Sequence, residues 1–122
     1  MSRERGQIYE NIAADYLQQQ GLSLITRNFQ CKAGELDLVC QDHKTLVFVE
    51  VKFRKNSLFG SALEMVSVSK QKKLVRTAEL FLLQNRKYRA HPCRFDVFAI
   101  TGYNNKQQSE KLDWIKNAFL IT

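Results

Sequence analysis

The feature that most constrains this chain is the run TLVFVEVKFR, residues 45–54, in which apolar residues enclose a glutamate and a lysine. Branched and aromatic residues at this density predict a buried β-strand. Successive side chains of a strand point to opposite faces, so Glu50 and Lys52 share one face. Leu46 and Phe48 precede them on that face, which is therefore not a plain solvent-facing surface. The chain places two charged groups where the pattern predicts burial.

A second alternating segment, ELDLVC at residues 35–40, precedes this strand. We expect one of its faces to carry Leu36, Leu38 and Cys40 and the other to carry Glu35, Asp37 and Val39. The polar residues 41–44 then reverse the chain, and consecutive strands joined by a short turn are usually neighbours in a sheet. Pairing of the two strands would bring Asp37 to Glu50 and Lys52.

The remaining elements follow from the spacing of apolar residues. Helical spacing predicts a helix over residues 7–20, which Gly21 would end. A second helix is expected to begin at Ser67 or Ser69, with a buried stripe of Leu74, Ala78, Phe81 and Leu82. Strands are expected over 22–29 and 94–100, and a short final element over 112–119 begins as a strand. Turns and loops are expected at residues 33–34, 56–60, 88–92 and 101–110.

These elements predict an α/β fold in the order α-β-β-β-α-β with a tail, in one domain spanning residues 1–122. A hydrophobic fraction of 44% and a charged fraction of 25% are typical of a soluble globular protein. No stretch approaches the roughly 18 to 20 apolar residues of a membrane span, and the N-terminus lacks the apolar core of a secretory signal. We therefore expect a cytoplasmic protein without a membrane partner, whose three cysteines are reduced thiols.

The charge of the chain favours a polyanionic partner. Its 19 Lys and Arg residues against 12 Asp and Glu residues give a net charge of +7. The basic residues gather in three groups: Lys52, Arg54 and Lys55; Lys70, Lys72, Lys73 and Arg76; and Arg86, Lys87 and Arg89. A solvated helix face would explain the second group equally well.

Two further patterns receive mainly structural interpretations. The pairs Cys40-x-x-His43 and His91-x-Cys93 could supply four zinc ligands, but their spacing differs from that of zinc fingers. Alternatively, Cys40 is a small apolar residue that ends a strand. Asp96, inside an apolar strand, is interpreted as a buried carboxylate with satisfied hydrogen bonds.

The approach of Asp37 to Glu50 carries a chemical consequence. Two ionised carboxylates a few ångströms apart repel each other unless a cation or a shared proton intervenes. Oxygen ligands suit Mg²⁺, which is commonly held by one or two carboxylates together with substrate phosphates. Lys52 could orient a water molecule or stabilise charge on a phosphorane-like transition state. The alternative is an ordinary solvated face of an antiparallel strand pair.

Asp37 followed by Glu50-Val51-Lys52 in an apolar strand resembles the motif of the PD-(D/E)xK, or restriction-endonuclease-like, nuclease superfamily. The chain also resembles the YraN-like family of uncharacterised bacterial proteins. The matching residues are Gly6, Glu10, Arg27, Asn28, GELDLV at 34–39, FVEVKFR at 48–54, Gly60 and RFDV at 94–97. The resemblance implies a restriction-endonuclease-like core with a mixed central sheet flanked by helices, similar to that of archaeal Holliday junction resolvases.

The resemblance also implies roles for individual residues. Asp37, Glu50, the Val51 carbonyl and Glu10 would bind Mg²⁺ or Mn²⁺, and Lys52 would be the catalytic lysine. Leu36 stands where the superfamily motif has proline, and the nearby Glu35 is an alternative ligand. Gln71 stands where related nucleases place a polar residue near the site. Contacts to nucleic acid are expected from Arg54, Lys55, Lys70, Lys73 and Arg76.

The first function expected from these residues is metal-dependent endonucleolytic hydrolysis of DNA, selective for branched or junction structures. Cutting both strands needs two active sites, which favours a symmetric homodimer. The alternative is a module that binds nucleic acid or another partner and retains the fold without catalysis. An RNA-binding factor would fit the charge equally well but lacks an identifiable aromatic stacking platform.

Overall fold

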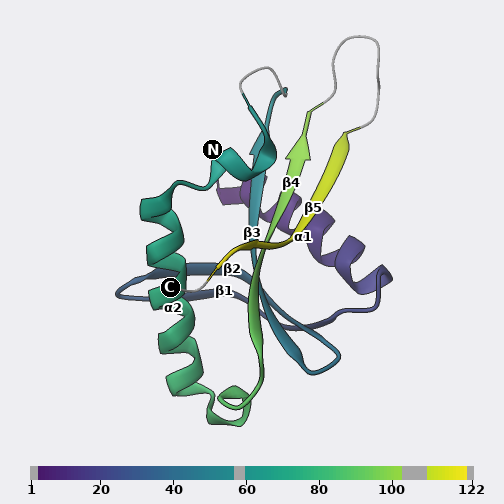
Figure 1. The fold of residues 1–122 in the computed structure, drawn as a ribbon. Helices are drawn as coiled ribbons and strands as arrows, with labels where there is room; N and C mark the ends of the chain where they lie inside the picture. Colours follow the sequence, from purple (N-terminus) through teal and green to yellow (C-terminus); the bar gives the residue numbers. More distant parts are fainter. Residues whose placement is uncertain (1–2, 57–59, 103–109, 121–122) are drawn as a thin grey trace.

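The computed structural model describes residues 3–56, 60–102 and 110–120 (Figure 1). Its helices and strands are α1 (Arg3–Gln19), β1 (Ser23–Cys31), β2 (Gly34–Asp42), β3 (Thr45–Arg54), α2 (Val68–Gln84), β4 (Cys93–Thr101) and β5 (Lys111–Phe119). Two short 3-10 helices, η1 (Ala62–Met65) and η2 (Arg86–Tyr88), flank α2. Parts of two expected loops, residues 57–59 and 103–109, lie outside the described residues.

The five strands form one mixed sheet in the order β1-β2-β3-β4-β5. Every neighbouring pair is antiparallel except β3 and β4, which run parallel from Leu46–Cys93 to Arg54–Thr101. The chain between these two strands includes α2. The predicted mixed α/β fold with two flanking helices is confirmed, and the tail forms the fifth strand of the sheet. No helix among the described residues is long and apolar enough to span a bilayer.

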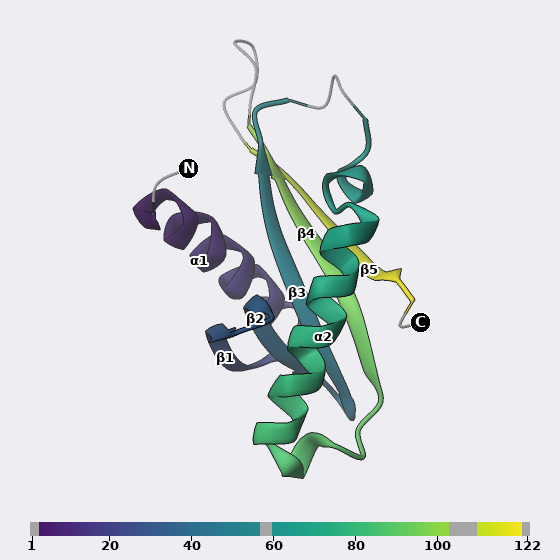
Figure 2. The same cartoon turned by 90° about the vertical axis from the view of Figure 1, so that its left-hand side faces the viewer.

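The two helices cover opposite faces of the sheet, as Figure 2 shows edge-on. One buried cluster joins α1 to the sheet through Ala13, Leu17, Leu38, Cys40, Val47, Val49 and Phe98. The other joins α2 to the opposite face through Leu36, Val39, Leu46, Phe48, Leu74, Ala78, Phe81 and Phe95. The alternation predicted for β3 is confirmed, because its odd-numbered valines face α1 while Leu46 and Phe48 face α2.

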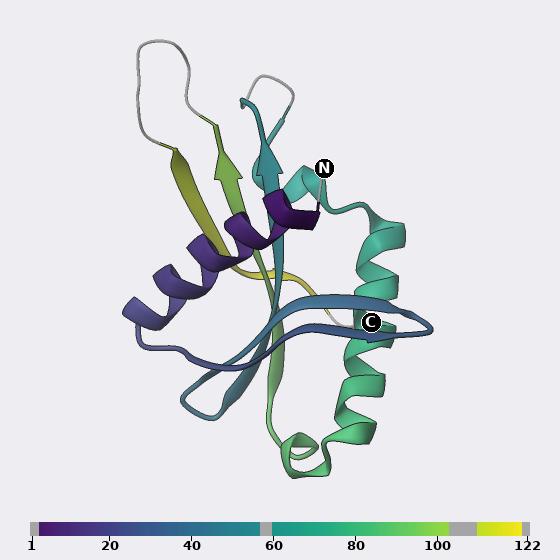
Figure 3. The same ribbon diagram turned by 180° about the vertical axis from the view of Figure 1, so that it is seen from behind.

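The alternation predicted for β2 is wrong at the beginning of the strand. Leu38 and Cys40 pack in the cluster beneath α1, but Leu36 packs in the cluster beneath α2. The cause is a bend: β2 pairs with β3 only up to Leu38 and Val49, whereas its pairing with β1 continues to Gly34. The tip of the β1–β2 hairpin, which includes the part of β2 that precedes Leu38, turns across the sheet toward α2 (Figure 3). Asp37 lies at this bend.

The ends of α1 and α2 also refine the prediction. α1 begins at Arg3, before the predicted residue 7. Of the two candidate caps for α2, Ser67 is the one used, and its Oγ accepts a hydrogen bond of 3.1 Å from the Lys70 backbone N–H. Leu74, Ala78 and Phe81 are buried as predicted, and Leu82 is partly buried.

Asp96 is a fully buried carboxylate in β4. It accepts hydrogen bonds from Arg94 Nε at 3.0 Å, from Trp114 Nε1 at 2.9 Å and from the Asn117 backbone N–H at 2.9 Å. Arg94 also reaches Asp42 of β2 at 3.1 Å. The structural interpretation of Asp96 is therefore confirmed: it ties β4 to β5 and, through Arg94, to β2.

Candidate functional site

Asp37 occupies the place where β2 leaves β3. The backbone N–H of Val51 donates to Asp37 Oδ2 at 2.9 Å. The carboxyl group therefore takes the place of a backbone acceptor on β2, which no longer pairs with β3 at this point. In an extended strand the N–H and C=O of one residue point to the same side. The Val51 carbonyl consequently faces the same region as the Asp37 carboxyl group.

At the bend, the Asp37 carboxyl group lies against Glu50. Burial, followed by the hydrogen bond to Glu50 and its negative charge, raises the pKa of Asp37 to about 9. The hydrogen bond from Val51 acts in the opposite direction but does not offset these effects. At neutral pH and without a cation, the raised pKa keeps a proton on Asp37. This is the proximity that the pairing of the two sequence segments predicts.

Glu50 is only 4% exposed and lies between two lysines. Its Oε2 is 3.7 Å from Lys52 Nζ and 3.3 Å from Lys70 Nζ. The contact with Lys52 follows from their shared strand face. The sequence predicts Lys70 only as one of the basic residues that bind nucleic acid. The Ser67 cap indicates that Lys70 lies in the first turn of α2, but nothing in the sequence indicates its contact with Glu50.

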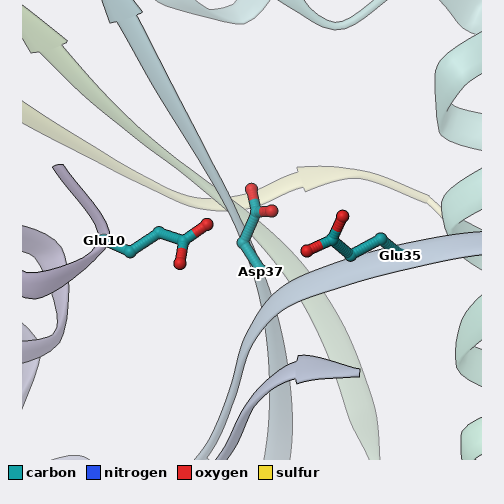
Figure 4. Close-up of side chains that lie close together, drawn as sticks. All are labelled: Glu10, Glu35 and Asp37. Atoms are coloured by element: carbon teal, nitrogen blue, oxygen red, sulfur yellow. The ribbon is translucent and has the colours of Figure 1, made fainter. Parts of the chain in front are cut away.

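Two further carboxylates, Glu10 and Glu35, lie beside Asp37 (Figure 4). Glu10 of α1, Glu35 and Asp37 each offer one oxygen, and these three oxygens lie within 4.8 Å of one another. Glu10 Oε1 is buried and has no hydrogen-bond partner within the described part of the chain; Arg27 Nη2 is 3.8 Å away. Burial raises the pKa of Glu10, while Asn28 and Arg27 oppose that increase.

These donors fit a hard divalent cation. Every side-chain donor is a carboxylate oxygen, which is the ligand type that Mg²⁺ and Mn²⁺ prefer. The buried oxygen of Glu10 lacks the partner that a bound cation would supply. Glu10, Glu35 and Asp37 are the carboxylates whose oxygens lie within 4.8 Å of one another, and the exposed Glu35 is one of them. Glu50, which meets Asp37, and the Val51 carbonyl lie beside this cluster and could complete the ligand set.

The site opens to solvent through a cavity of about 180 Å³. Besides the charged groups, Gly6, Tyr9 and Phe53 line it, and the last two rings stack with centroids 4.3 Å apart. A neighbouring cavity of about 250 Å³ is lined by Glu10, Glu35, Asp37 and the amide side chains of Gln7, Asn28 and Gln30. The sequence patterns do not indicate Tyr9, Gln7 or Gln30 as site residues.

Residues 9–100 match the family described as "Uncharacterised protein family UPF0102". The chain belongs to the UPF0102 family. The matched segment contains the whole carboxylate set and both lysines. The predicted resemblance to a YraN-like uncharacterised family is thereby confirmed.

Relatives in the UPF0102 family align over almost their full lengths. A UPF0102 protein of Stutzerimonas stutzeri (strain A1501) is 48% identical over 118 residues, covering 97% of this chain and 96% of the relative. One from Pseudomonas putida (strain W619) is 51% identical over 114 residues, covering 93% and 91%. One from Saccharophagus degradans (strain 2-40) is 47% identical over 118 residues, covering 97% and 94%.

The basic residues expected to bind nucleic acid differ in availability in this UPF0102 fold. Lys55, Lys73 and Arg76 are exposed. Arg54 is 15% exposed, and its guanidinium donates to Thr101 Oγ1 at 2.9 Å and to the Gly60 carbonyl at 2.8 Å. Arg54 therefore ties the end of β3 to β4 and to the following loop.

Two other candidate groups lie away from the carboxylates. Gln71 donates its side-chain amide to the Val66 carbonyl at 3.1 Å and lines a separate cavity beside Arg76. The Cys and His residues considered for zinc form no cluster within the residues that the structure describes. Cys40 is buried in the core, and the His43 side chain is 95% exposed. The apolar interpretation of Cys40 is the correct one.

Proposed function

We propose that this protein is a metal-dependent endonuclease that hydrolyses DNA phosphodiester bonds, with selectivity for branched or junction DNA. The observation that carries the proposal is the convergence of Asp37, Glu50 and Lys52 where β2 bends away from β3. The resemblance of this residue set to the PD-(D/E)xK nucleases supports the same chemistry. The preference for branched DNA rests on the resemblance to junction resolvases alone.

A divalent ion at this site would act as a Lewis acid and lower the pKa of a bound water. Asp37, Glu50, the Val51 carbonyl and Glu10 would hold it. To do so, Asp37 would give up the proton that its raised pKa retains. Lys52, 3.7 Å from Glu50, would orient the attacking water or stabilise negative charge on the reacting phosphate.

Binding of the polyanion would depend on charge. Lys55, Lys73 and Arg76 are exposed cations in a chain of net charge +7. Lysine and arginine that contact phosphates fix the position of a nucleic acid without reading its bases. The affinity of the proposed complex therefore falls as the salt concentration rises, because releasing counterions into a more concentrated salt solution is less favourable.

The test is cleavage of junction, flapped, single-stranded and duplex DNA in Mg²⁺ or Mn²⁺. Glu50→Gln and Lys52→Met should lower the rate by at least about a hundredfold, as expected for loss of a metal ligand or of transition-state stabilisation. Glu79→Gln and Lys44→Met, which alter exposed residues outside the site, serve as matched controls. Absence of cleavage by the wild-type protein, or equal cleavage by Glu50→Gln, would overturn the proposal.

A non-catalytic binding module is the second candidate. The observation that favours it is the neutralisation of Glu50 by both Lys52 and Lys70, which provides a balanced charge set without a metal ion. This candidate predicts salt-sensitive DNA binding with no cleavage in either metal. The same cleavage assay, combined with a binding assay at two salt concentrations, separates the two functions.

A further inference from the structure

Lys70 approaches the carboxylate pair from a different layer of the fold than the other charged groups. Its backbone is fixed in the first turn of α2, where its N–H donates to Ser67 Oγ. Its ammonium group reaches across to Glu50 Oε2 at 3.3 Å, a shorter distance than that of Lys52. The side chain is 42% exposed and lines the same cavity as Asp37 and Glu50. Lys70 is thus anchored at its backbone while its charged end faces both the carboxylate and solvent.

Glu50 Oε2 cannot hold Lys52, Lys70 and a divalent cation at close range at the same time, because the three positive charges repel one another. In the described structure, two ammonium groups compensate the nearly buried carboxylate. When a divalent cation is bound by Asp37 and Glu50, both ammonium groups face a larger positive charge at short range and are repelled. Lys70 has an open path to solvent and a flexible four-carbon stem, so it can withdraw without moving its helix.

We propose that Lys70 competes with the divalent cation for Glu50 and, once displaced, contacts a phosphate oxygen of the nucleic acid beside the cavity. This inference rests on the proposed function and adds a residue to it. Lys70 would pair with Glu50 in the metal-free protein and with a phosphate of the substrate in the metal-bound protein. Metal binding and nucleic-acid binding are then coupled, because the metal releases the Lys70 ammonium group from Glu50 and the nucleic acid binds the released group.

Competition predicts that removing the Lys70 charge increases the affinity for the metal, whereas removing a residue that supports metal binding would decrease it. Replacing Lys70 by methionine keeps an apolar stem but removes the charge that opposes the cation. The Lys70→Met variant should therefore bind Mn²⁺ several-fold more tightly than the wild-type protein, measured by titration calorimetry without DNA. Lys70→Arg, which keeps the charge, should bind Mn²⁺ like the wild type. Lys72→Met, an equal charge change at an exposed position of the same helix, should also leave the affinity unchanged.

The second measurement concerns DNA binding by the same proteins, followed by fluorescence anisotropy. Ca²⁺ serves as an oxygen-binding cation that supports binding, and EDTA gives the metal-free state. In Ca²⁺, Lys70→Met should weaken binding by about fivefold, which corresponds to the loss of one phosphate contact. In EDTA the loss should be about twofold or less, because Lys70 is then engaged with Glu50.

The outcomes separate this inference from the proposed function, since no cleavage is measured. Unchanged or weaker Mn²⁺ binding by Lys70→Met would overturn the role of Lys70 and leave the nuclease proposal intact. Equal losses of DNA affinity in Ca²⁺ and EDTA would also overturn it. Tighter Mn²⁺ binding by Lys70→Met supports the inference even if the wild-type protein cuts no DNA. Failure of the wild-type protein and Lys70→Met alike to bind Mn²⁺ would overturn both.

Discussion

The carboxyl group of Asp37 has two neighbours with opposite requirements. The Val51 N–H, 2.9 Å away, needs an acceptor, whereas an ionised Glu50 repels a second negative charge. A protonated carboxyl group satisfies both, because its carbonyl oxygen accepts from Val51 and its hydroxyl donates to Glu50. In the metal-free protein Asp37 therefore acts as a neutral link between the end of one strand and the buried acid of the next.

Asp37→Asn should stabilise the metal-free protein at alkaline pH. The folded pKa of Asp37, about 9, lies above the unfolded value of 3.8, so the folded state holds the extra proton between these values. The free energy of unfolding contributed by this group therefore falls as pH rises through that window. Asparagine mimics the protonated acid and cannot ionise, so the stability gained by the variant should be larger at about pH 8 than near pH 5.

Urea unfolding in EDTA at the two pH values measures this difference. Asp113→Asn, in which the replaced carboxylate pairs with Arg54 near the surface at 4.0 Å, is the control and should show no such gain. A larger gain for Asp37→Asn at the acidic pH than at the alkaline pH would contradict the expected sign of the effect.

Asp96 is expected to be the most stability-critical carboxylate. Asp96→Ala would leave the indole N–H of Trp114 and the Asn117 backbone N–H without their acceptor, and would leave Arg94 with Asp42 as its remaining carboxylate partner. Removing one partner of a buried, hydrogen-bonded charge lowers stability by about 3 to 5 kcal/mol. Asp113→Ala on β5, whose partner Arg54 keeps two other hydrogen bonds, should lower it by less than about 1 kcal/mol. Equal unfolding midpoints in urea for the two variants would show that Asp96 is not a structural centre.

At the scale of elements, the sequence predicts β3 well and β2 only in part. Alternation in β3 holds along the strand because the neighbouring β4 runs beside its whole length and a helix covers each face. In β2 the alternation is local, but the bend just before Leu38 depends on how the hairpin packs on α2. Gly34 shows that packing, since an added Cβ there would lie 3.1 Å from Thr77 Oγ1.

The same distinction applies to the site. The approach of Asp37 to Glu50 is predictable because a short turn makes their strands neighbours. The contact between Lys70 and Glu50 is not, because it depends on the tertiary position of α2 over the sheet. The absence of a hydrogen bond to Glu10 Oε1 within the described residues likewise depends on how α1 packs. Residue type therefore indicated the chemistry, while packing determined which residues join it.

The cap of α2 gives a test at this scale. Ser67→Ala removes the oxygen that accepts the Lys70 N–H and should lower stability by about 1 kcal/mol. For a domain of this length the melting temperature should fall by about 3 to 5 °C. Ser69→Ala, at the other cap position that the sequence allowed, lies inside the helix and should change the melting temperature much less. Thermal unfolding followed by circular dichroism compares the two, and equal decreases would refute the assignment of the cap.

At the scale of the whole molecule, the candidate site joins all three layers of the fold. α1 supplies Glu10, the sheet supplies Asp37 and Glu50, and α2 supplies Lys70 (Figure 2). The helices themselves pack on separate clusters at opposite faces of the sheet. An ion held by Glu10, Asp37 and Glu50 would therefore link α1 to β2 and β3. Its binding free energy would add to the stability of the folded chain.

Metal binding should accordingly raise the melting temperature of the wild-type protein. At a free Mn²⁺ concentration one hundred times the dissociation constant, linkage gives about 2.7 kcal/mol of added stability. Glu50→Gln should abolish the increase because it removes the negative charge that balances Lys52 and Lys70 beside the ion. Glu10→Gln should reduce the increase without abolishing it, because Glu35 and Asp37 keep their charges in the same cluster. Glu79→Gln, on the exposed face of α2, should retain the full increase, and thermal unfolding across a Mn²⁺ titration measures all four proteins. An equal increase in Glu50→Gln and Glu79→Gln would show that Mn²⁺ binds elsewhere, since only the former loses a carboxylate that meets Asp37.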